Sequence, residues 1–282
     1  MAAATADIVS PVGIVAGAGA MPFAVADQLA ARGLGTVILA LKGACDPSAV
    51  ARYRHHWVSV GQVGKMIKLF RSEGCRDVIF IGGIARPSLS EVRLDWGTLR
   101  LVAAAFRGGD DHLLSGVGRI FEQNGLRMVG VKDAAPGLLM PDGCITRGMP
   151  DGAALADIAR GQDVLAAISP FDIGQAVVVI DGHVVAVEDI EGTDGLLSRV
   201  ARLREQGRIR AKAGRGVLVK APKQGQDLRY DLPAIGSRTV EGAALAGLAG
   251  IAVAAGNAVV ADAQAMIEAA DKAGLFVTGL SA

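Results

Sequence analysis

The segment from Lys223 to Thr239, KQGQDLRYDLPAIGSRT, concentrates the residue types that act on phosphate groups. It holds two acids, three bases, two glutamines and a tyrosine, in a chain that is 51% hydrophobic. A carboxylate among cations can bind Mg²⁺ or orient a water molecule, while the bases neutralise phosphate oxygens. The segment therefore predicts metal-assisted phosphoryl hydrolysis, and a solvated charged face is the alternative.

Polar and apolar side chains alternate from Asp227 to Leu232. With a period of two, Asp227, Arg229 and Asp231 would share one face of a half-buried strand. Pro233 would end that strand. The pattern predicts a strand that presents acid, base and acid in a row.

A second group of charges lies in EDIEGTDGLLSRV, residues 188–200. Thr193 or Asp194 could simply cap the helix that follows. Four acids within seven residues exceed what one cap needs, so a cation or basic partners must relieve their repulsion. These acids are Glu188, Asp189, Glu191 and Asp194.

In GGDDHLLSGV, Asp110 and Asp111 stand at a predicted helix start. Adjacent carboxylates can bind Mg²⁺ or a ribose. Taken alone, the pair is better explained as helix capping.

Two glycine-rich turns follow predicted strands. In GIVAGAGAMP, Gly17 and Gly19 would let a phosphate or ribose approach the backbone at a helix start. Pro22 replaces the third glycine of the dinucleotide fingerprint, and Lys42 stands where that fold has an acid. The pattern indicates a nucleotide other than NAD, with a tight turn that binds nothing as the alternative.

The second turn, GGIARPSL, holds Gly82, Gly83 and Arg86. Because ligands bind beyond the carboxyl ends of parallel strands, these glycines should lie on the same rim as the first turn. Arg86 would meet a phosphate there, or be an ordinary surface arginine.

Strands and helices alternate through the first half, which predicts a Rossmann-like parallel sheet. The second half adds a hairpin around Asp181-Gly182 and predicts a mixed α/β domain. We therefore expect an α/β protein with a domain at 1–132, a linker at 133–150 and a second domain at 151–282. Expected helices include 97–107, 151–168 and 263–273.

Composition limits the partners. The 29 basic and 28 acidic residues nearly cancel, so no bulk field favours nucleic acid. The three cysteines match no disulfide or metal spacing, which indicates a reducing cytoplasm, and the N-terminus lacks the basic start of a signal peptide. The uncharged run 242–261 is long enough to span a membrane, but Gly250 and Asn257 favour a buried helix followed by a strand.

Four motifs resemble, in order, the LpxI-type UDP-2,3-diacylglucosamine pyrophosphatases. They are IVAGAGAMP, GGDDHLL, EGTDGLL and K-x-x-K-x-x-QD-x-R-x-D-x-P-x-(I/V)-G-x-x-T. The resemblance implies a cytoplasmic enzyme of lipid A synthesis, soluble or peripheral on the inner membrane, that hydrolyses UDP-2,3-diacylglucosamine to UMP and 2,3-diacylglucosamine 1-phosphate (lipid X). It also implies a divalent cation, Mg²⁺ or another such as Mn²⁺, and transient inner-leaflet contact. A homodimer stays open.

The resemblance also implies residue roles. The N-terminal domain would hold UDP, and the C-terminal domain the acylated sugar phosphate. The implied catalytic residues are Asp227, Asp194, Lys223 and Arg229. The implied metal ligands are Asp227, Glu191, Asp194, Asp110, Asp111 and Asp231. The implied nucleotide rim is Gly17, Gly19, Met21, Pro22, Gly82, Gly83 and Arg86.

Two other classes remain as alternatives. A nucleotide-dependent oxidoreductase is opposed by Pro22 and Lys42. A non-catalytic nucleotide-sugar binding protein would bind the substrate and release no UMP.

Overall fold

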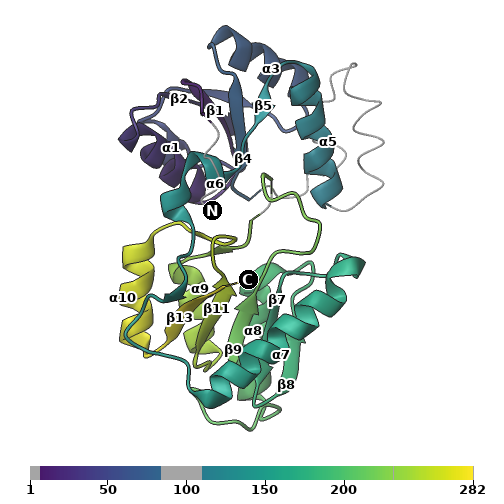
Figure 1. The fold of residues 1–282 in the computed structure, drawn as a ribbon, viewed down its shortest axis with the longest axis vertical. Helices are drawn as coiled ribbons and strands as arrows, with labels where there is room; N and C mark the ends of the chain where they lie inside the picture. Colours follow the sequence, from purple (N-terminus) through teal and green to yellow (C-terminus); the bar gives the residue numbers. More distant parts are fainter. Residues whose placement is uncertain (1–6, 84–109, 231, 282) are drawn as a thin grey trace. The chain divides into compact units, whose positions relative to one another are not determined.

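The computed structural model describes residues 7–83, 110–230 and 232–281, with the backbone alone over 110–113 (Figure 1). The chain forms two compact units, each built around its own sheet. The first comprises residues 1–138 and 227–231, and the second 139–226 and 232–282. The boundary falls inside the expected linker, and part of the charged segment belongs to the first unit.

The first unit contains a five-stranded parallel sheet in the order β3-β2-β1-β4-β5. Its central strands are short apolar runs such as TVILAL, because a parallel sheet is covered on both faces. The strands are β1 Val12–Ala16, β2 Thr36–Leu41, β3 His55–Val58, β4 Asp77–Ile81 and β5 Arg127–Met128.

Helices connect these strands. Side chains from α3 and α5 pack into one apolar core with Val15, Leu39 and Phe80 of the sheet, while α1 packs against β1 and β2. The described helices are α1 Met21–Ala31, α2 Pro47–Val50, α3 Val63–Ser72, α5 Asp110–Gln123, α6 Val131–Ala134 and the 3-10 turn η1 Pro136–Leu138.

The second unit holds a six-stranded mixed sheet in the order β6-β13-β11-β9-β7-β8. The strands β9, β11 and β13 run parallel, whereas β7 is antiparallel to both β8 and β9. A two-stranded sheet pairs β10 with β12. The strands are β6 Gly143–Cys144, β7 Ala176–Ile180, β8 His183–Val187, β9 Val217–Lys220, β10 Ala234–Ile235, β11 Gly250–Ala254, β12 Val259–Val260 and β13 Phe276–Leu280.

Alternate residues of the central strands enter two different cores. Val177 and Val179 of β7 pack with α7, whereas Val178 and Ile180 pack with α8, α9 and α10. This period of two sandwiches the sheet between helical layers. The helices are α7 Gly152–Ile168, η2 Ser169–Phe171, α8 Gly192–Glu205, α9 Ser237–Leu245 and α10 Ala263–Ala273.

These observations confirm the predicted α/β fold with a parallel N-terminal sheet and a mixed C-terminal one. The uncharged run 242–261 divides between α9, β11 and β12, as expected for buried elements. Among the described residues, no helix combines the length and the hydropathy that a membrane span requires. The expected helix at 97–107 lies outside the described residues.

The predicted strand from Asp227 to Leu232 is wrong. Residues 228–230 form a turn, in which the Tyr230 amide donates to the Asp227 carbonyl at 3.0 Å. The Asp227 carboxylate also accepts the Arg229 amide at 3.1 Å. An aspartate that binds a nearby backbone amide offers the chain an alternative to a sheet ladder, and here that local bond prevails.

The Gly17→Ala variant should lower the free energy of unfolding by about 1–3 kcal/mol, the usual range for overpacking. A Cβ on Gly17 would lie 2.5 Å from the Gly83 carbonyl oxygen, which is backbone and cannot rotate away. Urea unfolding followed by circular dichroism measures the loss.

Gly152→Ala is the matched control, because a Cβ there meets no atom within 4 Å. It should leave stability unchanged or slightly raised. Equal unfolding curves for the two variants would contradict the steric explanation.

Candidate functional site

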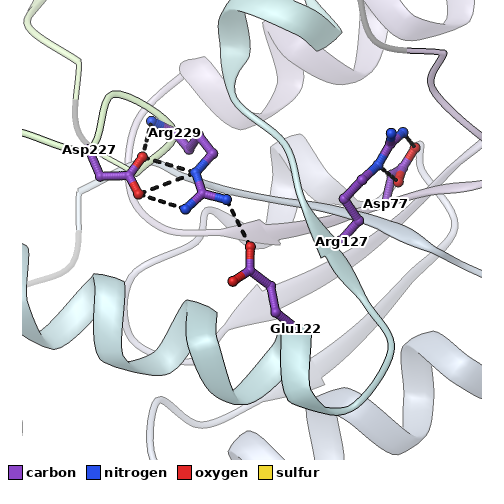
Figure 2. Close-up of polar contacts among 5 residues, drawn as sticks. All are labelled: Asp77, Glu122, Arg127, Asp227 and Arg229. Carbon is purple, nitrogen blue, oxygen red and sulfur yellow. Dashed lines mark hydrogen bonds and ion pairs between the residues drawn. The ribbon is translucent and has the colours of Figure 1, made fainter.

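Asp227 and Arg229 form a closed ion pair within one turn (Figure 2). The Arg229 Nη2 donates to Asp227 Oδ2 at 2.7 Å, and Nε donates to Oδ1 at 3.0 Å. Two parallel bonds of this kind fix the carboxylate plane as well as its charge. The turn therefore presents a preorganised acid–base pair.

The same guanidinium reaches a second carboxylate. Nη1 of Arg229 donates to Glu122 Oε1 at 2.8 Å, so Arg229 lies between Asp227 and Glu122 (Figure 2). Glu122 stands near the end of α5, 107 residues earlier in the chain. Sequence reasoning missed it, because no local pattern distinguishes this glutamate from an exposed helical one.

This arrangement changes the proton affinities of the pair. The Arg229 guanidinium lowers the pKa of the Asp227 carboxyl, chiefly through their side-chain hydrogen bond, while burial opposes the shift. The pKa of Arg229 is raised, chiefly by its bond to Asp227. Both groups are therefore charged at neutral pH.

Tyr230 anchors the turn in the first unit. Its ring lies 6.0 Å from Phe80 and packs against the core that includes Phe121. A Cβ on Gly118 of α5 would lie 1.9 Å from the Tyr230 hydroxyl oxygen, so only glycine leaves room there. Burial raises the pKa of the Tyr230 hydroxyl. The aromatic contact holds the turn that contains Asp227 and Arg229 against the core of the first unit.

Figure 2 also shows the separate pair of Asp77 and Arg127. Asp77 is 1% exposed and accepts two bonds from Arg127, each of 2.7 Å. The two residues begin β4 and β5, at the edge opposite the carboxyl rim. The pair joins neighbouring strands and takes no part in the site.

The two glycine turns lie together on the carboxyl edge of the parallel sheet, as expected. The Gly17 amide donates to the Ile81 carbonyl at 2.9 Å, and Ala18 and Gly83 exchange amide–carbonyl bonds of 2.7 and 3.0 Å. These amides are thus engaged with each other. Gly19, by contrast, is exposed at φ +91° with open space around it.

The helix after this rim begins at Met21, with Pro22 in its first turn. Ala20 is the N-cap and its side chain provides no capping bond. Met21 is half-buried and Pro22 is buried. Among the described residues of the predicted nucleotide rim, Gly19 and Gly83 are therefore the exposed ones, and Ala18 and Ala20 beside Gly19 are exposed as well.

In the second unit, arginines pair with acids of the cluster at residues 188–194. Basic partners were one of the two ways in which the repulsion among these acids was expected to be relieved, a bound cation being the other. Glu191 pairs with Arg199, and Asp194 pairs with Arg238 at 2.6 Å. Neither Thr193 nor Asp194 caps α8, because Glu191 is the N-cap and contributes no capping bond. The capping alternative for these two residues is therefore wrong.

Glu188 lies deeper than the other acids, at 6% exposure. Its Oε1 accepts the Thr193 hydroxyl at 2.6 Å, and that hydroxyl accepts Lys220 Nζ at 2.8 Å. Lys220 is 5% exposed. Sequence analysis gave Lys220 no role, although a lysine that ends the apolar strand VLVK is a signal for a buried charge.

Lys223 forms an ion pair with Asp172, and the Gln224 amide donates to Ser169 Oγ at 2.6 Å. These contacts hold the start of the charged segment against η2. Lys223 belongs to the second unit, whereas Arg229 belongs to the first.

Several predicted residues have no described side chain. Arg86 and Asp231 lie outside the described residues, and Asp110 and Asp111 begin α5 with only their backbone described. Within the part of the chain that is described, no three His, Cys, Asp or Glu side chains form a metal-binding group.

The geometry defines a class: a two-unit α/β protein with a glycine rim on one carboxyl edge and charge-paired carboxylates on both units. Family models identify the halves. Residues 11–138 match the LpxI N-terminal domain, and residues 141–278 match the LpxI C-terminal domain. The chain belongs to the LpxI family.

A curated relative supports this assignment. The UDP-2,3-diacylglucosamine pyrophosphatase LpxI of Caulobacter vibrioides is 42% identical over 271 residues, which cover 95% of this chain and 96% of that protein. Among solved structures, a Mycobacterium tuberculosis glycinamide-RNase-transformylase T covers 62% of this chain and 43% of its own, at 14% identity. Its TM-score of 0.22 is too low to indicate a shared fold.

Replacing Arg229 with Met should reduce stability in a pH-dependent way. Because the folded pKa of Asp227 is depressed, the ion pair stabilises the protein fully above about pH 4, the ordinary aspartate value, and less as pH falls below it. Solvent screening limits the difference in unfolding free energy at neutral pH to about 1 kcal/mol.

Urea unfolding of wild type and variant from pH 7 to pH 3 tests this. The stability gap should narrow in acid. Arg202→Met, at an exposed position of α8, should show no pH-dependent gap. A constant gap for Arg229→Met would contradict the assigned pairing.

Proposed function

We propose that this protein hydrolyses the pyrophosphate bond of UDP-2,3-diacylglucosamine to UMP and 2,3-diacylglucosamine 1-phosphate, as a step of lipid A synthesis. The observation that carries the proposal is the 42% identity, along nearly the whole chain, to a protein named for that pyrophosphatase activity. The charged turn of Asp227 and Arg229 supports it, because it combines the two charges that the chemistry needs.

Asp227 is proposed as the central carboxylate of the reaction. Its lowered pKa keeps it ionised at neutral pH, which suits a metal ligand or a group that orients water by a hydrogen bond. The same shift makes it a weak proton acceptor, because an effective general base has a pKa near the working pH. We therefore favour ligand or orienting chemistry over proton abstraction.

Arg229 is proposed to stabilise phosphate charge. It already contacts two carboxylates, so a phosphate oxygen that draws the guanidinium from Asp227 leaves it held by Glu122. A guanidinium fork matches phosphate oxygens geometrically as well as electrically. Lys223 would add a second cation after exchanging its partner Asp172.

A divalent cation, Mg²⁺ or Mn²⁺, fits the donor chemistry. Mg²⁺ is usually held by one or two carboxylates together with substrate phosphates, so an ionised Asp227 is a suitable ligand. When bound, the ion would polarise the phosphoryl group and lower the pKa of a coordinated water molecule. Further proposed ligands are Asp110, Asp111, Asp231, Glu191 and Asp194.

We assign the uridine nucleotide to the first unit and the acylated sugar phosphate to the second. The exposed backbone around Gly19 and the cation Lys42 lie at the carboxyl ends of neighbouring strands β1 and β2. Ligands of open parallel sheets bind at that edge. Because the Gly17 and Ala18 amides are engaged, we expect contacts from the exposed residues Gly19 and Ala20.

Asp227→Ala should lower kcat for UMP release at least 100-fold, on the order of losing a principal electrostatic group. EDTA should abolish release by wild type, and added Mg²⁺ should restore it. The assay separates UMP from UDP-2,3-diacylglucosamine by chromatography, and hydrolysis in ¹⁸O-labelled water identifies the attacked phosphorus.

Asp163→Ala is the control, because Asp163 is an exposed acid on α7. It should retain wild-type activity. Wild-type protein that binds UDP-2,3-diacylglucosamine but releases no UMP would refute hydrolysis in favour of a binding protein. Tight NAD binding without UDP binding, measured by calorimetry, would favour the oxidoreductase alternative.

We also propose transient contact with a lipid surface. Phe171 and Ile190 are large apolar side chains that are 73% and 83% exposed. Phe171 precedes β7 in the chain and Ile190 follows β8, and these two strand ends adjoin where the Gln175 amide donates to Glu188 at 2.8 Å. Exposed apolar side chains near adjoining strand ends would suit shallow insertion among lipid headgroups.

The double variant Phe171→Ser with Ile190→Ser should lose at least half of its binding to vesicles of phosphatidylethanolamine and phosphatidylglycerol. Cosedimentation measures this. Leu245→Ser is the matched control, since Leu245 is 78% exposed at the end of α9 and should not affect binding. Equal sedimentation of all three proteins would exclude the contact.

A further inference from the structure

Lys220 directly precedes residues 221–233 and also contacts the residue that directly follows them. It is the last residue of β9, directly before the segment, and is 5% exposed. Its Nζ donates to the Ala234 carbonyl at 3.1 Å, and Ala234 begins β10 directly after the segment. The buried Lys220 ammonium thus links the end of β9 to the start of β10.

The ammonium belongs to a chain of polar contacts within the second unit. Thr193 accepts from Lys220 at 2.8 Å and donates its hydroxyl hydrogen to Glu188 at 2.6 Å. The second Glu188 oxygen accepts the Gln175 amide at 2.8 Å. The network therefore joins the residue before β7, the β8–α8 connection, the end of β9 and the start of β10.

Stability alone does not account for this network. Replacing buried ionic groups with apolar side chains of similar volume is often neutral or stabilising. A leucine or methionine at position 220 would continue the apolar strand VLVK, but it has no donor for the Ala234 carbonyl. What the lysine adds is a fixed position for the returning chain.

That position matters because of what lies between the two ends. The second unit contains residues 139–226 and 232–282, whereas residues 227–231, with Asp227 and Arg229, belong to the first unit. Residues 221–226 therefore connect the end of β9 to the turn that contains Asp227 and Arg229, and residues 232–233 connect that part of the chain to the start of β10. A displacement of about 1 Å at reacting groups can reduce rates about 100-fold.

We infer that Lys220, held by Thr193 and Glu188, is a positioning residue that fixes where the chain leaves β9 and re-enters β10, on either side of the residues that include Asp227 and Arg229. This inference rests on the proposed hydrolysis and adds a determinant of it outside the reacting turn. The Thr193 hydroxyl is hydrogen-bonded to both Lys220 and Glu188. Removing this hydroxyl would therefore break the hydrogen-bonded link between the two buried charges.

Thr193→Val and Thr193→Ser form the matched pair for the test. Valine has nearly the same shape but no hydroxyl, whereas serine keeps the hydroxyl. In full-length Thr193→Val, amide hydrogen exchange over residues 221–236 should accelerate at least tenfold. Its kcat for UMP release should fall about 10- to 100-fold with KM changed less than threefold, in line with misplaced catalytic groups. Thr193→Ser should recover most of both.

Thr36→Val controls for the loss of a hydroxyl elsewhere, because Thr36 begins β2 in the first unit. It should match wild type in both measurements. Lys220→Met should resemble Thr193→Val, and combining the two should add little, because both break one network. Additive losses in kcat would mean independent structural damage and would overturn the inference.

The outcomes separate the two proposals. Unchanged exchange in Thr193→Val, or faster exchange with unchanged kcat, would overturn the positioning role while hydrolysis stands. Wild-type protein without UMP release would refute the proposed function, and the positioning of a catalytic segment would fall with it.

Discussion

The bidentate ion pair between Asp227 and Arg229 is the interaction on which the candidate site depends. Because the Asp227 carboxylate also accepts the Arg229 amide, the chain turns instead of extending. The turn directs Tyr230 onto Phe80 and brings Arg229 to Glu122. One local hydrogen-bonding preference thus determines both the polar geometry and its hydrophobic anchor.

A second property follows from the paired state of the charges. Asp227, Glu191 and Asp194 each have an arginine partner, and Lys223 has an aspartate. If these residues bind the substrate as proposed, binding would exchange partners instead of neutralising isolated charges. Such exchange avoids the penalty of leaving a partly buried charge unpaired, provided that each displaced group finds a new partner. The contact with Glu122 would give Arg229 a remaining partner if its bond to Asp227 were broken.

The glycine rim shows how a sequence motif can have more than one physical cause. Glycines after parallel strands are expected where backbone approaches a phosphate. Here the close approach at Gly17 is to the backbone of Gly82 and Gly83, whose carbonyl oxygens would lie 2.7 and 2.5 Å from any added Cβ. Gly19, by contrast, is exposed and has open space around it.

The sequence by itself determined the α/β class, the order of most strands and helices, and the family. Apolar runs such as DVIFI and hairpin chemistry at Asp181-Gly182 are local signals that survive folding, because burial and turn preference act on the same residues. It also located the charged segment and the acidic cluster. The alternation of polar and apolar residues could not reveal that the Asp227 carboxylate would accept the nearby Arg229 amide, which replaces the predicted strand with a turn.

Only the tertiary structure decided which polar and charged side chains meet. Glu122 reaches Arg229 across 107 residues, and Lys220 reaches Thr193 across 27. Neither contact has a local pattern, because each depends on how strand ends and helices are brought together by burial of apolar faces far from the charges themselves. Sequence supplied the chemical groups, whereas packing selected their partners.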